Sequence, residues 1–265
     1  RPTVLDPRQF LCRFPGCSLT NKHQAQSSRT ASLSSFSIPS VTTMGNEISS
    51  LVEPVADLFS KHPHLDKYFA ELEKTAKEAN DEMERVMLAG DYGALGEARE
   101  NIQKREEEME QRLATHAINA FKHYDQNRKG FLEADESKVF FQHYVSCYFD
   151  YFERFGLFKE KVACQMHKDF AGMDIKEETD KKMQEITKHA RDKLTSYEQN
   201  EAELSKAAFE VLDVNKNGKL QHQEVVDALA PRHPMNIEFH VALGMMTEAE
   251  AKAVSEQAGR RWGKI

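Results

Sequence analysis

The chain has 265 residues, a formal net charge of −7, 40% hydrophobic residues and 30% charged residues. Such a length can bury a core without disulfide or metal cross-links, and 12 glycines with 8 prolines exclude collagen-like and mucin-like proteins. The most apolar stretch, 139–158, is interrupted by charged residues, so an integral membrane protein is not expected. Four cysteines without a CxxC spacing favour a reducing compartment and a cytoplasmic protein.

Residues 1–43 differ in charge from the rest of the chain. They hold five basic residues against one acidic residue, whereas residues 44–265 are acidic overall, and the first methionine is Met44. Two interpretations stay open for this disordered leader: a targeting peptide rich in Arg and Ser, and upstream sequence read in frame before the true start. We favour the second, because a targeting peptide should itself begin with Met.

The segment 44–64 is predicted to be a flexible N-terminus. Met44 is followed by Gly45 and, four residues after that glycine, by Ser49, which matches the pattern for N-myristoylation of Gly45. A single myristoyl chain binds membranes only marginally, and no cysteine or basic cluster nearby supplies a second anchor. Any contact with a membrane through this acyl chain is therefore expected to be reversible, and the alternative is an unmodified terminus.

Apolar residues at helical spacing predict an all-α protein without a convincing strand. Residues 65–112 should form a helical hairpin, and the charged run 105–108 should be a solvated helix face. The aromatic residues of 134–155 are expected to be core, with a groove for a partner as the alternative. A break is expected at 231–234, within a C-terminal tail over 231–265. Helices are predicted over 65–87, 97–124, 134–155, 159–170, 176–194, 202–212, 223–229 and 247–257.

Two segments, 120–136 and 208–224, repeat one pattern of oxygen-bearing residues. In the second loop, 213–224, Gly218 stands at position 6 and Leu220 at position 8. Alternate positions of this loop can surround a hard cation with oxygens, because calcium takes six to eight of them. The candidate ligands are Asp213, Asn215, Asn217, the Lys219 carbonyl, Gln221 through a water, and Glu224.

The first loop, 125–136, follows the same pattern with one departure. Lys129 stands at position 5, where an oxygen ligand is expected, and Glu133 could compensate as a direct ligand. The alternative is a metal-free partner loop. Its candidate ligands are Asp125, Asn127, the Phe131 carbonyl, Glu133 and Glu136.

Both loops resemble the calcium loop of the EF-hand superfamily. The resemblance implies an EF-hand pair of helix-loop-helix units within residues 113–230, with Ca²⁺ as the bound cofactor. The two loops begin 88 residues apart, which is wider than neighbouring hands, and 174–185 lacks the residues of a third loop. We therefore expect the two hands to pair with each other across a helical insertion, 137–212.

No other motif of comparable specificity is present. His62 and His64 form a His-x-His pair in a polar segment, which is rarely a metal site, and Cys147 and Cys164 are expected to be unreactive thiols. Phosphate-binding loops, nucleophile elbows and kinase signatures are absent from the sequence, so no enzyme is expected. The acidic balance argues against nucleic acid as a partner.

These features together predict an intracellular calcium sensor or modulator. In such a protein the hands open on binding calcium and expose apolar surface to a helix of a target protein. Two alternatives stay open: a calcium buffer that binds without opening, and a helical scaffold or interaction protein in which calcium is structural.

Overall fold

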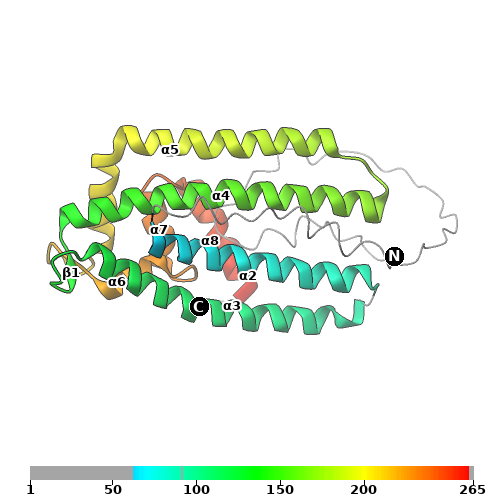
Figure 1. Cartoon of the computed structure of the whole chain (residues 1–265), viewed down its shortest axis with the longest axis horizontal. Coiled ribbons are helices and arrows are strands. Elements are labelled where there is room, and N and C mark those ends of the chain that lie inside the picture. The colour runs from blue at the N-terminus through cyan, green and yellow to red at the C-terminus, as the bar shows by residue number, and fades with distance from the viewer. Residues whose placement is uncertain (1–61, 91, 263–265) are drawn as a thin grey trace. The chain divides into compact units, whose positions relative to one another are not determined.

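The computed structural model describes residues 62–90 and 92–262 (Figure 1). Gly45, the leader 1–43 and most of the predicted flexible N-terminus lie outside these residues. The all-α class is confirmed for the described part, whose two strands have two residues each. The elements are α2 (Pro63–Leu88), the 3-10 helix η3 (Tyr92–Ala94), α3 (Leu95–Tyr124), β1 (Phe131–Leu132), α4 (Ala134–Ala171), α5 (Lys176–Leu212), β2 (Leu220–Gln221), α6 (His222–Leu229), α7 (Pro234–Ala242) and α8 (Glu248–Trp262).

Within this part of the chain no helix combines the length and the apolar content needed to cross a bilayer.

Helices α2 and α3 form the predicted hairpin. Two ion pairs show that they run antiparallel. Arg112 Nε lies 2.6 Å from Glu71 Oε1. Arg105, seven residues earlier, pairs with the later residue Glu82, with Nη2 3.7 Å from Oε2. Apolar residues on the facing sides of both helices fill the hairpin near its turn. They are Ala79, Met83, Val86, Ala98 and Ile102.

Helices α4 and α5 are longer than the sequence patterns predicted. The expected helices 134–155 and 159–170 join into α4, because Gly156 between them is itself helical. A Cβ atom at Gly156 would lie 2.9 Å from Ile186 Cγ2, so the missing side chain lets α5 pass close to α4. The expected gap within α5 survives as a kink at Asn200, where φ is −119° and ψ is 18°.

The segment after α6 contains a helix that the sequence analysis missed. The break predicted at 231–234 is confirmed for 231–233, and the helix predicted at 247–257 corresponds to α8. No helix was predicted between them, and this was wrong because residues 234–242 form α7. Pro234 at the first helical position and the His233 side chain, which accepts a hydrogen bond from Met235 N, were the available start signals. Asn236 ties α7 to α6 by donating to Ala228 O at 2.6 Å.

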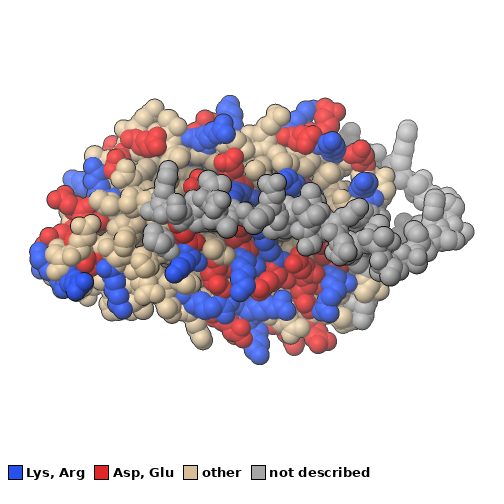
Figure 2. All heavy atoms as spheres, viewed as in Figure 1, with Lys and Arg blue, Asp and Glu red and all other residues tan. Residues whose placement is uncertain are grey.

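The charged run 105–108 does not face solvent throughout. Glu106 is buried, and its Oε2 lies 3.2 Å from Arg232 Nη2, while Arg232 Nε lies 2.8 Å from Glu110 Oε1. The expectation of a solvated face is therefore wrong at Glu106, because the segment between α6 and α7 folds onto α3. Elsewhere acidic and basic side chains are interspersed over the face seen in Figure 2.

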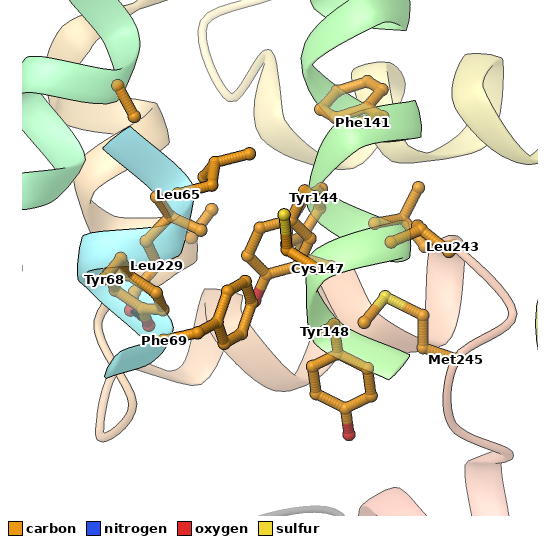
Figure 3. Close-up of a cluster of buried hydrophobic side chains, with 14 of the residues drawn as sticks. Leu65, Tyr68, Phe69, Phe141, Tyr144, Cys147, Tyr148, Leu229, Leu243 and Met245 are labelled. Carbon is orange, nitrogen blue, oxygen red and sulfur yellow. Dashed lines mark hydrogen bonds between the residues drawn. The ribbon is translucent and has the colours of Figure 1, made fainter. Parts of the chain in front are cut away.

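The aromatic residues of α4 are core, as predicted, and α2 covers part of them (Figure 3). The ring of Phe69 lies 5.4 Å from that of Tyr144 and 5.6 Å from that of Tyr151, measured between centroids. Tyr68, also buried, donates its hydroxyl proton to the carbonyl of Leu229 at the end of α6. The N-terminal turns of α2 are thus bonded to the helix that leaves the second loop.

A buried histidine makes this core sensitive to acid. Nε2 of His240 in α7 lies 2.8 Å from the hydroxyl of Tyr144, and burial lowers the pKa of His240 to about 4. The ring is therefore neutral in the folded protein at neutral pH, and protonating it would place a charge in an aromatic environment.

We predict that the free energy of unfolding falls as the pH drops from about 6.5 towards 4. Over this interval His240 becomes protonated in the unfolded chain but stays neutral in the folded protein. The loss attributable to this residue is up to about 3 kcal/mol. Urea unfolding at pH 7 and pH 4.5 measures it, and His240→Gln, which keeps a polar partner for Tyr144, should lose less stability over this interval. Equal losses in the wild type and the variant would contradict the prediction.

Candidate metal centre

The two predicted loops have the same backbone conformation. Each begins at the residue that ends a helix, where Asp125 and Asp213 both have φ −73° and ψ 70°. Position 6 has a positive φ in both, 82° at Gly130 and 74° at Gly218. Such a turn favours glycine, because a Cβ atom is strained there. The sequence repeat therefore corresponds to a structural repeat.

The loops pair with each other across the helical insertion, as predicted. β1 and β2 are antiparallel, with Leu132 opposite Leu220 and Phe131 opposite Gln221. Both leucines are fully buried, so position 8 of each loop contributes one backbone pair and one core side chain. Figure 1 shows the two loops at the same end of the long helices.

In the second loop the side chain of Asp213 organises the turn. Its Oδ1 accepts a hydrogen bond from Asn217 N at 2.9 Å, and its Oδ2 accepts one from Gly218 N at 2.7 Å. The oxygen of Asn215 accepts from the same Asn217 N–H at 3.1 Å. The oxygen of Asn217 accepts from Lys219 N at 2.8 Å. Oxygens at positions 1, 3 and 5 are thus turned into the loop.

Glu224 at position 12 closes the second loop from the first turn of α6. Its Oε2 accepts from Gln221 N at 2.8 Å, and its Oε1 lies 3.2 Å from the amide nitrogen of Asn215. Because Asn215 also shares a donor with Asp213, the side chains of positions 1, 3 and 12 converge on one another. Glu224 and Asp213 are both buried, so two carboxylates face this small volume.

The donor set of the second loop fits a hard cation. It comprises two carboxylates, two side-chain amide oxygens, the Lys219 carbonyl and Gln221, which are the ligand types that calcium takes. Over residues 62–90 and 92–262, no group of three His, Cys, Asp or Glu side chains is placed to hold a metal ion. The second loop has only two such side chains, Asp213 and Glu224. Its remaining candidate ligands are side-chain amide oxygens and a backbone carbonyl, which a group of His, Cys, Asp and Glu side chains does not include.

The first loop repeats this scaffold. Asp125 Oδ1 accepts from Lys129 N at 2.9 Å, and Asp125 Oδ2 accepts from Gly130 N at 2.8 Å. Glu136 accepts from Glu133 N at 3.1 Å, and Glu136 Oε1 also accepts from the amide nitrogen of Asn127 at 2.9 Å. The predicted ligands of positions 1, 3 and 12 are therefore brought together here as well.

Positions 5 and 9 distinguish the first loop from the second. Lys129 Nζ lies 2.7 Å from Glu133 Oε1, and both side chains are about half exposed. The hydrogen bond to Glu133 raises the pKa of Lys129, and the charges of Glu133, Glu136 and Asp125 raise it further. Glu133 was expected as a compensating ligand, and its ion pair with Lys129 was not foreseen. The helical i,i+4 rule gave no signal for it, because β1 (Phe131–Leu132) lies between the two residues.

A cation–π contact joins the two loops beside the strands. Lys219 Nζ, at position 7 of the second loop, lies 4.0 Å from the centroid of the Phe131 ring, at position 7 of the first. Such contacts contribute about 0.5–1 kcal/mol at exposed sites. No local sequence pattern predicts this contact, because it depends on the pairing of distant loops.

Among residues 62–90 and 92–262, the weaker candidate residues belong to no group of three possible metal ligands. The ring of His64 lies 5.0 Å from that of His123, and burial, followed by the charge of His123, lowers the pKa of His64. Cys147 is buried 3.5 Å from Asp66 Oδ1, and burial raises the pKa of its thiol. Cys147 and Cys164 are both outside disulfides.

Comparisons with models of known protein families, with curated proteins and with solved structures give no match to this chain. The functional argument therefore rests on the chemistry and geometry of the two loops.

We predict that Leu220→Ala destabilises the protein by about 2–5 kcal/mol, because the leucine is fully buried where the loops pair. Val214→Ala, in the same loop but 62% exposed, should change the free energy of unfolding by less than about 0.5 kcal/mol. Urea unfolding of the two variants checks this. Similar small effects would mean that the leucine pair is not a stabilising contact.

We also predict that Gly218→Ala costs about 1–2 kcal/mol, because φ is +74° there while no atom lies within 4 Å of the added Cβ. Gly96→Ala is the matched control: nothing lies within 4 Å of its Cβ either, but Gly96 lies in α3, so alanine should be neutral or slightly stabilising. Thermal unfolding distinguishes the two, and equal costs would rule out backbone strain as the cause.

Proposed function

We propose that this protein binds calcium through an EF-hand pair in which the second loop, 213–224, is the stronger site. The observation that carries the proposal is the convergence of Asp213, Asn215 and Glu224 on one another within a loop whose backbone amides are already bonded. Hydrogen bonds from the loop's own backbone amides restrain these side chains, which would reduce the conformational entropy lost when an ion binds. The ion would supply positive charge that offsets the repulsion between the Asp213 and Glu224 carboxylates.

The first loop supports the second through the strands. The pairing of Leu132 with Leu220 fixes the position of the chain immediately after Gly218 and before Glu224. Because Glu224 lies in the first turn of α6, an ion bound by it would pull on that helix. The two loops are therefore proposed to act as one unit.

We propose first that the protein acts as a calcium sensor, which changes conformation when calcium binds. In the described structure the apolar faces are closed, and among the side chains described only Val139, Met173 and Val214 are large, apolar and exposed. Exposing a surface for a target helix would require α2 to leave the aromatic face of α4, breaking the bond from Tyr68 to the end of α6. Calcium at Glu224 could favour this by moving α6.

The second candidate is a calcium buffer, or a helical scaffold with structural calcium. The observation in its favour is that α2 already covers the aromatic residues, with Phe69 among the rings of Tyr144 and Tyr151. In a buffer, calcium would stabilise this closed arrangement without releasing α2. A role at membranes through Gly45 and a cytoplasmic location remain predictions.

We predict that the full-length chain binds calcium in millimolar magnesium with a dissociation constant on the order of micromolar, as measured by calorimetry. Glu224→Gln should abolish the tighter site, because it removes the bidentate carboxylate, and Glu136→Gln should have a smaller effect. Glu210→Gln, an exposed residue of α5 outside both loops, is the matched control and should bind as the wild type does. No heat on addition of calcium would overturn the proposed function.

An apolar dye added during the same titration separates the two candidate roles. A rise in dye fluorescence that saturates with the calcium signal supports a sensor. Binding of calcium with unchanged fluorescence contradicts the sensor and favours the buffer or scaffold.

A further inference from the structure

We propose that the first loop carries its own cation, the Lys129 ammonium, so that the protein binds one calcium ion per chain and binds it in the second loop. This inference rests on the proposed function and concerns the division of labour between the two loops.

The two loops differ in the residue at position 5, where a calcium-binding loop needs an oxygen ligand. In the second loop Asn217 occupies this position, and its side-chain oxygen faces the loop, where it accepts from Lys219 N. In the first loop Lys129 stands at the same position and offers an ammonium, which has donors and no acceptor. A cation in the first loop would lose one ligand and meet a like charge instead.

The ninth position removes the expected compensation. Glu133 could replace the missing ligand only with its own carboxylate, but Oε1 of that carboxylate already lies 2.7 Å from Lys129 Nζ. Gln221, its counterpart in the second loop, is uncharged. Calcium bound through Glu133 would therefore lie beside the Lys129 ammonium unless the Lys129–Glu133 pair separated.

The first loop is nevertheless fully formed. Asp125 accepts from two backbone amides, and Glu136 accepts from the Glu133 amide, as their counterparts do in the second loop. It also supplies Leu132 to the strand pair and Phe131 to the contact with Lys219. Because the Lys129 ammonium offsets the charge of the nearby carboxylates, the first loop is proposed to support its partner at any calcium concentration. Binding by the second loop should then follow a single-site isotherm without cooperativity.

The test is a calorimetric titration of the full-length chain with Ca²⁺ in millimolar magnesium. We expect a stoichiometry of one for the wild type and two for Lys129→Asn, which removes the ammonium and supplies the oxygen found at Asn217. Lys129→Met removes the charge without supplying an oxygen, so we expect it to stay near one or to gain a second ion at least about tenfold more weakly than Lys129→Asn does. Lys138→Asn is the matched control, because Lys138 is 50% exposed and Lys129 46% exposed, and it should stay at one.

The outcomes separate this inference from the proposed function. Two ions per wild-type chain, one lost in Glu136→Gln and one in Glu224→Gln, would overturn the inference and leave the proposed function standing. A stoichiometry of one in Lys129→Asn, with unchanged circular dichroism, would also overturn it. The absence of binding to the wild type would overturn both.

Discussion

The antiparallel pairing of Leu132 with Leu220 is the contact on which the candidate site depends. Each leucine stands two residues after the glycine that turns its loop, so pairing the leucines sets both loops in register. The two loops begin 88 residues apart in the chain, so bringing them together costs conformational entropy. The packing of α4 against α5 along their length offsets this entropy cost. The helical insertion thus allows distant loops to behave as neighbours.

A second constraint comes from α2, which closes the apolar face that the loops and their helices create. The bond from Tyr68 to Leu229 and the ring contacts of Phe69 connect the N-terminal hairpin to both α6 and α4. One core cluster accordingly contains residues from α2 through Met245. Any movement of α6 would be resisted by this core, so ion binding and core packing are expected to be energetically linked.

The asymmetry of the loops has a simple electrostatic origin. A cation-binding loop gathers oxygens that repel one another, and either a metal ion or an internal cation can offset this repulsion. Among its candidate ligands the second loop has two carboxylates and relies on the amides of Asn215 and Asn217. The candidate ligands of the first loop include three carboxylates, and Lys129 stands among them. The same scaffold of hydrogen bonds can therefore serve a binding loop and a supporting loop.

The sequence alone indicated most of the helices, the repeated oxygen-bearing positions of the two loops and the turn glycines, because these depend on residues close together in the chain. It also indicated that the loops would pair, since each lacks a nearer partner. Only the tertiary structure decided that α4 continues through Gly156, where packing against Ile186 needs a residue without a side chain. Likewise, α7 and the pairing of buried Glu106 with Arg232 depend on contacts between distant segments, which local spacing does not encode.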